Sequence, residues 1–388
     1  MLSQYPNQKK LREERLSKAL HVLTLLDLDA LLVTTWDNVR YITGARTVIS
    51  PEWSSLLTAV LTRDGDVGLF GPFREGREEQ ESLEKLGDWT IFPIGENSAI
   101  PEKWARTYSK LLKHFGKSRG KIGVDFMGFQ IFQQLQRDLP GCEFVDSFRA
   151  LLDERAVKTP EEIKALSNSA RIVDEGMNAA LNNLSAGRRE NEVYAKAASK
   201  MIEMGSEGEP FYQMLSSGDR STDHIFPSTK QIIPGEPVLI DMGCFVDGYA
   251  GDLARTGCYG PIDKKFRDLY SSFYEGYVDG IKLVAAGKKT STIDREIRRI
   301  LRESECPANP TSLGHGIGMR CIEFPSFNLV DEPNEIETND SDILKPGMVI
   351  TIEPKVTVQG IGTIGLEDMI LIQEGGTKKL TGSPYLTP

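Results

Sequence analysis

The chain of 388 residues is long enough for two domains, and its 39% hydrophobic and 26% charged residues are typical of a soluble globular protein. A net charge of −10 argues against a nucleic-acid binder, which would carry a basic face. No apolar run approaches the roughly 20 residues that span a bilayer, and the polar N-terminal segment lacks a signal core. We therefore expect a cytoplasmic protein without a membrane partner.

The cysteines and histidines limit the kinds of metal site that the chain can form. The five cysteines include no CxxC pair, which indicates reduced thiols rather than a disulfide framework or a thiolate site. With only four histidines, a metal centre must rely mainly on carboxylate oxygens.

Residues 1–155 alternate between helical and extended patterns. The predicted elements are helices at 9–26, 101–116 and 128–138, strands at 30–34, 121–125 and 143–145, and a hairpin at 57–71. This alternation predicts an α/β domain with a mixed sheet. It contains neither a phosphate loop nor a dinucleotide fingerprint.

A second domain is predicted over residues 156–388, with α+β composition. Thr159-Pro-Glu-Glu162 carries the signals of a capped helix start, with proline at the first helical position. No internal repeat stands out. The predicted elements are helices at 160–183, 189–204, 264–286 and 290–303, and strands at 211–217, 231–241, 249–258, 322–328, 347–358 and 363–373.

Two aspartates lie in a predicted β-hairpin of the second domain. Asp241 ends the apolar run Val238-Leu-Ile240, a turn is expected at Val246-Asp247-Gly248, and Asp252 lies on the return strand. The two carboxylates can face each other across the strands, where a divalent cation would offset their repulsion. Solvated turn residues or salt-bridge partners are the alternative interpretation.

Three further residues join them as candidate ligands. His315 lies between two glycines, while Glu353 and Glu367 each adjoin an apolar β-type run. Alone, each has a structural interpretation, as a packed histidine or an end-of-strand acid. No nearby basic residue is an evident partner for the acids, and a shared metal centre would satisfy them all.

Four carboxylates and one imidazole carry more charge than one divalent ion neutralises, so two ions are expected. Oxygen-rich donors favour Mn, Co or Fe, with Zn possible, and we take Mn as the first choice. Such a centre suits hydrolysis of an amide-like bond by a metal-activated water. His224 could hold a substrate oxygen. A loop histidine bonded to backbone is the alternative.

The segments VLIDMGCFVDGYAGDLARTG, SLGHGIGM, PGMVITIEP and GLEDMILI resemble the metal-binding motifs of the creatinase, prolidase and methionine aminopeptidase family. The spacings 252 − 241 = 11 and 367 − 353 = 14 match those motifs. Asp37–Gly44 and the linker LLDERAVKTPEEIKAL are also similar, so the resemblance covers the whole chain. It implies an N-terminal creatinase-like domain over 1–155 and a catalytic domain with the "pita-bread" fold over 156–388.

The resemblance also implies a role for each ligand. Asp241 and Asp252 would bind one metal ion, and Asp252 would also bridge the pair. His315 and Glu353 would bind the second ion, and Glu367 would bridge both. Glu353 would serve as general base or proton shuttle. The implied activity is that of an Xaa-Pro dipeptidase or aminopeptidase acting on short peptides.

His224 matches the family's substrate-contacting histidine, and two other positions depart from the pattern. Ile322 stands where the peptidases carry a second histidine, and Gly365 where the Xaa-Pro peptidases carry an arginine. Both missing groups handle substrate. An alternative is therefore an enzyme for a small metabolite, such as a creatinase-like, ectoine hydrolase-like or dimethylsulfoniopropionate lyase-like protein. An inactive scaffold is a further alternative.

A homodimer is expected by analogy, with the N-terminal domain of one subunit helping to close the site of the other. That arrangement would bring Trp36, Arg40, Tyr41 or the 47–53 loop near the substrate.

Overall fold

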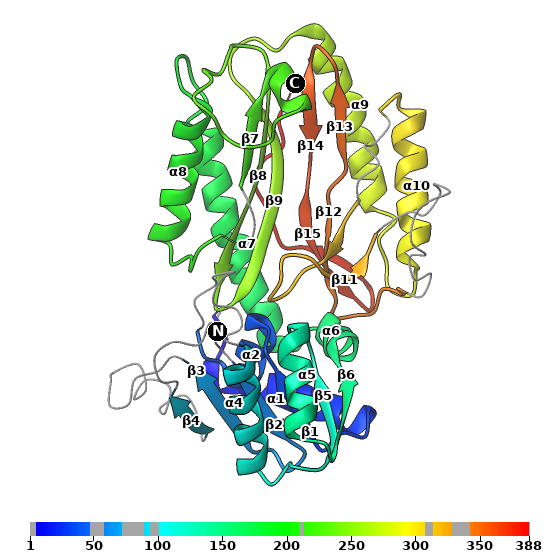
Figure 1. The fold of residues 1–388 in the computed structure, drawn as a ribbon. Helices are drawn as coiled ribbons and strands as arrows, with labels where there is room; N and C mark the ends of the chain where they lie inside the picture. The colour runs from blue at the N-terminus through cyan, green and yellow to red at the C-terminus, as the bar shows by residue number, and fades with distance from the viewer. Residues whose placement is uncertain are drawn as a thin grey trace. The chain divides into compact units, whose positions relative to one another are not determined.

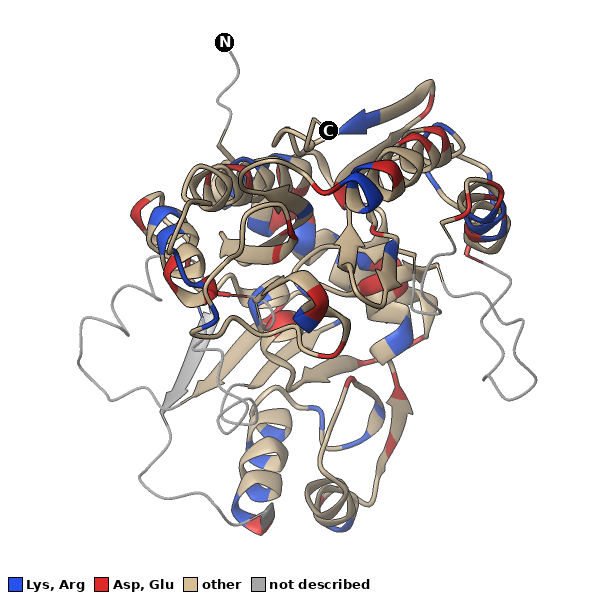
Figure 2. Cartoon of the chain, turned by 90° about the horizontal axis from the view of Figure 1, so that it is seen from above, with Lys and Arg blue, Asp and Glu red and all other residues tan. Residues whose placement is uncertain are grey.

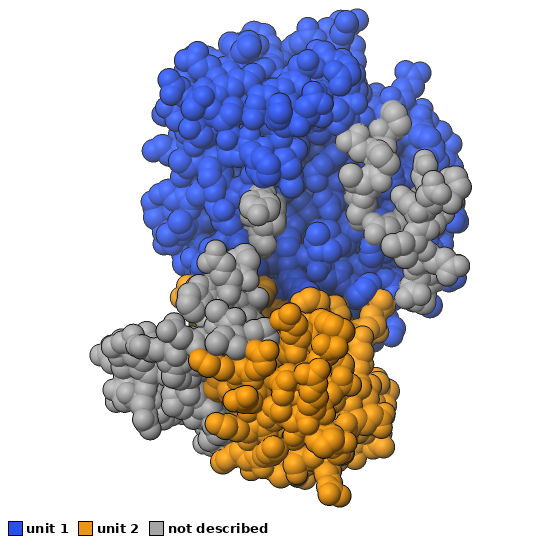
Figure 3. Space-filling model, in the orientation of Figure 1, with its two compact units in different colours: residues 1–5, 156–388 blue, residues 6–155 orange. Residues whose placement is uncertain are grey.

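The computed structural model describes residues 5–46, 58–71, 89–93, 101–209, 213–306, 313–327 and 342–387. The chain divides into two compact units, Pro6–Arg155 and one that holds Ala156–Pro388 (Figure 3). The 47–53 loop lies outside the described residues, as do parts of the strands expected at 211–217 and 322–328.

The N-terminal unit contains a mixed sheet, as predicted. Its described strands run in the order β4-β3-β2-β1-β5-β6, with β1 antiparallel to β2 and parallel to β5. The elements are α1 (Gln8–Leu25), β1 (Ala30–Val33), α2 (Trp36–Thr43), β2 (Thr58–Thr62), β3 (Val67–Gly71), β4 (Trp89–Pro93), α4 (Pro101–His114), β5 (Gly120–Val124), α5 (Phe129–Asp138), β6 (Cys142–Asp146) and α6 (Phe148–Ala156).

Helices cover both faces of this sheet, because alternate residues of a strand point to opposite sides. Leu31 and Val33 of β1 pack in a cluster with α1 and α2, whereas Ala30 and Leu32 pack in a cluster with α4 and α5. Such two-sided burial explains why β1 is apolar at all four positions.

Helix α2 is an element that the sequence analysis did not anticipate. It begins after Thr35 and ends at Gly44, whose φ of 76° is a left-handed helix cap. Asp37 of this helix accepts a hydrogen bond from Arg155 at 2.6 Å. The Tyr41 ring lies against the guanidinium groups of two arginines within the unit and is 1% exposed. The Tyr41 ring is therefore packed inside its own unit, and the expectation that this segment comes near a substrate in a homodimer stays a prediction.

The C-terminal unit combines paired helices with antiparallel strands (Figure 1). Its elements are α7 (Pro160–Leu181), α8 (Glu190–Glu203), β7 (Met214–Ser217), the 3-10 helix η2 (Gly218–Thr222), β8 (Pro237–Val246), β9 (Tyr249–Cys258), α9 (Lys264–Ile281), α10 (Thr290–Glu303), β10 (His315–Gly316), β11 (Glu323–Ser326), β12 (Val349–Ile352), β13 (Lys355–Val358), β14 (Gly362–Gly365), β15 (Asp368–Gln373) and β16 (Gly376–Lys379). The predicted capping box of α7 is confirmed by reciprocal hydrogen bonds between Thr159 and Glu162.

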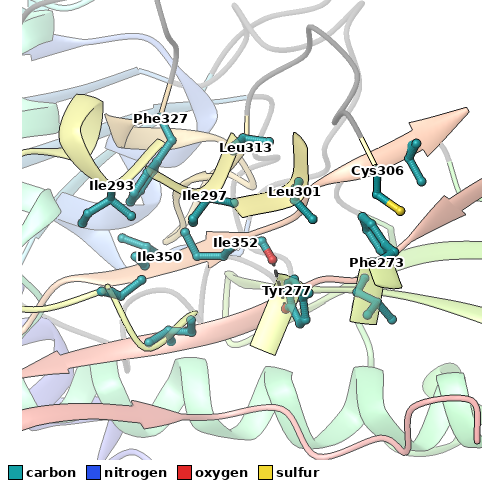
Figure 4. Packing of buried hydrophobic residues seen from close by; sticks show 14 of the residues in the cluster. Phe273, Tyr277, Ile293, Ile297, Leu301, Cys306, Leu313, Phe327, Ile350 and Ile352 are labelled. Atoms are coloured by element: carbon teal, nitrogen blue, oxygen red, sulfur yellow. Dashed lines mark hydrogen bonds between the residues drawn. The ribbon is translucent and has the colours of Figure 1, made fainter. Parts of the chain in front are cut away.

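Two helix pairs flank the strands of this unit on opposite sides (Figure 1). Helices α7 and α8 share a core with β7, β8 and β9, while α9 and α10 share another with β12 and β15. In the second core Tyr277 packs among aliphatic side chains, and its hydroxyl oxygen lies 3.2 Å from the Ile352 carbonyl oxygen (Figure 4). Basic and acidic residues are interspersed along the helices (Figure 2).

The unit repeats one motif, which inspection of the sequence missed. In each half a helix pair precedes the strands, with Gly187 or Gly287 at positive φ in the connection. Asp241 lies 241 − 235 = 6 residues after a Pro-Gly pair, and Glu353 lies 353 − 347 = 6 residues after another.

The strands predicted at 347–358 and 363–373 are each interrupted. β12 ends at Ile352 and the chain enters a separate two-stranded sheet as β13, and the return strand β14 likewise ends before β15 begins. The prediction of two continuous strands is wrong because Pro354 has no amide hydrogen for a ladder. Both breaks coincide with candidate ligands, Glu353 and Glu367. Among the described residues, no helix has the length and apolar character needed to cross a membrane.

Candidate metal centre

The β8–β9 hairpin brings the two aspartates to one face of a sheet. Val246 pairs with Tyr249, which leaves Asp247 and Gly248 as a two-residue turn with φ values of 53° and 81°. The predicted hairpin is thus confirmed. Asp241 pairs with Ala254, however, and so lies diagonally from Asp252 instead of directly opposite it. Diagonal residues share a face and lie about 7–8 Å apart, which leaves space between the carboxylates.

Main-chain hydrogen bonds hold the two glutamates beside the other candidate ligands. The Glu353 amide donates to the Leu313 carbonyl at 2.8 Å, two residues before His315. The Glu367 amide donates to the Ala254 carbonyl at 3.0 Å, two residues after Asp252. The chain therefore leaves its sheet at each glutamate and is bonded at that point to another ligand-bearing segment.

His315 lies where the backbone is too crowded for side chains on its neighbours. A Cβ atom at Gly314 would lie 2.1 Å from the Thr351 carbonyl oxygen, and one at Gly316 would lie 2.0 Å from that of Phe324. The flanking glycines of the motif are thus required for close strand approach. They place the buried imidazole beside Glu353, with 3.1 Å between Nε2 and Oε1.

The five predicted ligands converge. In the described part of the chain, two groups of possible ligand atoms lie within 4.8 Å of one another, and both include Glu367. The first group adds Asp252 and His315, and the second adds Asp241 and Glu353. This grouping differs from the one that the family resemblance implies, which joins Asp241 with Asp252. Asp241 and Asp252 nevertheless share one face of the hairpin, as diagonal neighbours.

Unpaired oxygens show that the cluster fits a cation. Within the described residues, Asp252 Oδ1 and both carboxylate oxygens of Glu367 are buried without a hydrogen-bond partner. Burying ionised oxygens in this way is costly unless a positive charge is present. Carboxylate oxygens with one imidazole nitrogen form a donor set that suits a divalent ion. The first group therefore fits the metal that the sequence predicts.

The hydrogen bonding of His315 leaves one ring nitrogen for a ligand. Nδ1 lies 3.1 Å from the Gly316 carbonyl oxygen, which favours the tautomer with the proton on Nδ1. Burial lowers the pKa of His315. The hydrogen bond and charge of Glu353 have the opposite and larger effect, so the pKa lies above its usual value. Nε2, the other ring nitrogen, lies 3.1 Å from Glu353 Oε1.

Burial and mutual repulsion act on the acids. Burial and the charge of Asp241 raise the pKa of Asp252 to about 7. The pKa values of Asp241 and Glu367 are also raised, in each case mainly by burial. Glu353 differs: burial alone would raise its pKa, but Lys355 and His315 lower it to about 2.

Lys355 is the main residue of the site that sequence reasoning missed. Its Nζ lies 2.8 Å from Glu353 Oε2 and 3.1 Å from Asp241 Oδ2. The expectation that the acids lack a basic partner is therefore wrong for these two. The spacing of two residues from Glu353 could have suggested a shared strand face. The chain break at Pro354 made that inference uncertain, because the face depends on where the strand ends.

Cys321 is a second contact that the sequence did not reveal. Its thiol lies 2.9 Å from Asp252 Oδ2 and is buried. Burial and the charge of Asp252 raise the pKa of Cys321, so the thiol stays protonated and donates. The next residue, Ile322, has a side chain that is 70% exposed, so the position of the family's second histidine faces outward.

A separate, fully paired acid adjoins the cluster. Asp368, next to Glu367, accepts hydrogen bonds from Arg255, Tyr277, Tyr385 and Thr381. The Arg255 side chain is completely buried and also donates to the Glu367 carbonyl oxygen at 2.6 Å. This network fixes the backbone from which the Glu367 side chain projects.

His224 lies apart from these buried groups, on an exposed segment after η2. Its amide donates to the Arg220 carbonyl at 3.0 Å, and the following residues Ile225 and Phe226 are 37% and 52% exposed. An exposed ring beside apolar side chains is available to a ligand. Its predicted contact with substrate stays a prediction.

Comparison with known proteins shows the family to which the chain belongs. The model of metallopeptidase family M24 matches residues 164–374, and that of the creatinase/prolidase N-terminal domain matches residues 15–157. The chain belongs to metallopeptidase family M24. It is 30% identical to a Xaa-Pro dipeptidase of Pyrococcus furiosus over 74% of this chain and 80% of that protein.

Members of this family from a second Pyrococcus species match nearly the whole chain. A Xaa-Pro dipeptidase of Pyrococcus horikoshii is 28% identical over 95% of this chain and 97% of its own length. A prolidase structure from the same species superposes with a TM-score of 0.78 at 26% identity, covering 96% of this chain and 99% of that one. This M24 protein is thus a metal-dependent hydrolase with the pita-bread fold, and the predicted family and fold are confirmed.

Proposed function

We propose that this M24 protein hydrolyses the peptide bond before proline in short peptides, as a Xaa-Pro dipeptidase or aminopeptidase. The buried, unpaired oxygens of Asp252 and Glu367 beside His315 carry the proposal, because they would suit a cation within the segment that matches the M24 model. The names of the relatives that match over most of the chain supply the substrate class.

The ligand set in this proposal is the one that the sequence predicts: Asp241, Asp252, His315, Glu353 and Glu367. Manganese is the resident ion of first choice, since carboxylate oxygens outnumber the single imidazole. A bound divalent ion polarises the scissile carbonyl and lowers the pKa of water to near neutrality.

Glu353 is the proposed general base and proton shuttle. Its pKa of about 2 keeps it ionised at neutral pH, so it can accept a proton from the attacking water and pass it to the leaving nitrogen. Part of this low pKa comes from the hydrogen bond of His315. Lys355 supplies the rest through its charge and its hydrogen bond to Glu353.

The proposed substrate contact is His224, as the sequence predicts. Its segment is exposed, and Phe226, two residues later, is 52% exposed, so both are accessible to a ligand. Position 365 is a glycine and not the arginine of the family pattern. A substrate carboxylate must therefore be recognised by another group.

Assay of the Mn²⁺-loaded chain on Ala-Pro and Leu-Pro tests the proposal. We expect turnover that Glu353→Gln abolishes and that Glu374→Gln, at an exposed strand end, leaves unchanged. Absence of proline-dipeptide turnover with Mn, Co, Fe or Zn would contradict the proposal. Turnover of creatine, an ectoine-type amidine or dimethylsulfoniopropionate instead would favour the small-metabolite alternative, which the positions of Ile322 and Gly365 suggest.

A homodimeric assembly and a cytoplasmic location complete the proposal. Light scattering on the purified chain at several concentrations tests the first, with a mass of twice 43.1 kDa expected. Fractionation of the native cells tests the second.

A further inference from the structure

The Lys355 ammonium lies within one of the two ligand groups and outside the other. Its Nζ bonds to Asp241 and Glu353, which belong to the group that Glu367 completes. Asp252 and His315 belong to the first group, which has no ion pair with this lysine in the described contacts. A positive charge is thus already present in the second group.

The structure around Lys355 accommodates its side chain. Lys355 pairs with Gly365 across β13 and β14. A Cβ atom at Gly365 would lie 3.1 Å from Lys355 Cγ and 2.9 Å from Leu239 Cδ1. A larger residue at 365 would therefore push the lysine stem aside. The glycine that replaces the family's arginine is also the residue that makes room for the lysine on the facing strand.

The contacts of Lys355 favour an ammonium over a metal ion at this group. A divalent ion bonds carboxylate oxygens at about 2.0–2.2 Å. An ion bonded to Asp241 and Glu353 would compete for the oxygens that Nζ contacts at 3.1 and 2.8 Å, and would lie close to a like charge. An ammonium has three donors and satisfies those oxygens directly.

We propose that Lys355 takes the place of a second cation, so that this M24 protein binds one divalent ion, at Asp252, His315 and Glu367. The inference deepens the proposed function and rests on it for the identity of the metal. It departs from the two ions that the charge of the sequence motifs suggests. Lys355 then acts as a positioning residue that holds the carboxylates of Asp241 and Glu353 in place beside a single metal ion.

Metal stoichiometry of the full-length chain tests this directly. We expect titration calorimetry and elemental analysis after Mn²⁺ loading to give one ion per chain for the wild type and two for Lys355→Met, which keeps the stem and removes the charge. Lys355→Arg should stay at one ion. The matched control, Lys378→Met at an exposed position of β16, should also stay at one.

Electron paramagnetic resonance gives a readout that does not depend on activity. The wild type should show the spectrum of isolated Mn²⁺, and Lys355→Met that of a spin-coupled pair. Two ions in the saturated wild type, or a single ion in a folded Lys355→Met variant, would overturn the inference.

The outcomes separate this inference from the proposed function. Proline-dipeptide turnover by a wild type with two ions would leave the function standing and remove the role of Lys355. A wild type that binds one ion but does not turn over proline dipeptides would support the role of Lys355 and contradict the proposed function. If Lys355→Met does not fold, the wild-type stoichiometry and spectrum still decide.

Discussion

Glu367 and Asp368 are neighbours in sequence, and both are completely buried, yet their surroundings are opposite. Asp368 accepts hydrogen bonds on both oxygens from Arg255, two tyrosines and a threonine. Neither oxygen of Glu367 has a partner among the described residues. The chain is evidently able to pair a buried acid at this point of the fold.

The difference separates a structural acid from one kept for an external ligand. The paired acid holds the strands and the C-terminal segment together, because Arg255 also donates to the Ser383 carbonyl. The unpaired acid contributes nothing to stability in the absence of a cation, since its desolvation is not offset. Removing the Asp368 carboxylate should therefore destabilise the fold, whereas removing the Glu367 carboxylate should lower activity.

The largest effect is expected for Asp368→Ala. It leaves the Arg255 guanidinium buried without its counter-charge, which should lower the free energy of unfolding by about 3–5 kcal/mol. Urea unfolding followed by circular dichroism measures the change. Asp279→Ala, which removes an exposed partner of Lys282, is the matched control, with an expected change of about 0–1 kcal/mol. Equal effects would break the comparison.

Glu367→Gln should act on catalysis instead. We expect kcat/KM to fall by more than about a hundredfold, the upper end of what outer partners of a metal site contribute. The metal-free variant should be at least as stable as metal-free wild type, because an unpaired buried charge has been removed. Kinetics and thermal unfolding in EDTA measure both. A variant that unfolds while keeping its activity per folded molecule would reverse the assignment.

Removal of the metal should destabilise the wild type more than a variant that lacks the Glu367 carboxylate. Chelation should lower the free energy of unfolding of the wild type by about 2.7 kcal/mol relative to metal at a hundred times its dissociation constant. The same treatment should have little effect on Glu367→Gln. Denaturant curves with and without Mn²⁺ test this, and an equal metal response in both proteins would show that Glu367 does not take part in binding.

The smallest effect concerns the alkaline stability of the paired acid. Burial and the charge of Asp368 raise the pKa of Tyr277 well above its usual value. Above about pH 10 an unfolded tyrosine loses its proton while folded Tyr277 keeps it. The folded state then binds more protons, so the free energy of unfolding falls as pH rises, by about 1.4 kcal/mol per pH unit for this group.

Tyr277→Phe should remove that share of the pH dependence, at a cost of about 1 kcal/mol at neutral pH for the lost hydrogen bond. Urea unfolding between pH 9 and 11 for both proteins gives the slopes. Parallel curves would show that Tyr277 does not hold its proton through Asp368.

The sequence predicts the convergence of the five candidate ligands because Asp241, Glu353 and Glu367 each adjoin an apolar β-type run and because all five lie in segments that resemble one family's metal-binding motifs. Hairpin turn chemistry at Asp247-Gly248 and the capping box at Thr159 are equally local and are confirmed. Their roles as metal ligands stay predictions. The helix α2 could also have been found, from Gly44 at its end.

Contacts that depend on a change of sheet could not be predicted in the same way. Lys355 and Cys321 reach the acids only because the chain leaves β12 at Glu353 and because the segment after β10 folds back toward Asp252. Strand patterning shows which residues alternate, but it does not show where a strand stops. The diagonal register of Asp241 and Asp252 likewise depends on the length of the turn between their strands.

The main-chain bonds from Glu353 to Leu313 and from Glu367 to Ala254 have a consequence for how this protein can change. The donors in these two bonds are backbone N–H groups, which every residue type except proline has. Side chains at 353 and 367 can therefore be exchanged without rebuilding the scaffold. Natural variation or laboratory design can thus change the set of candidate ligands, and with it the chemistry, one position at a time.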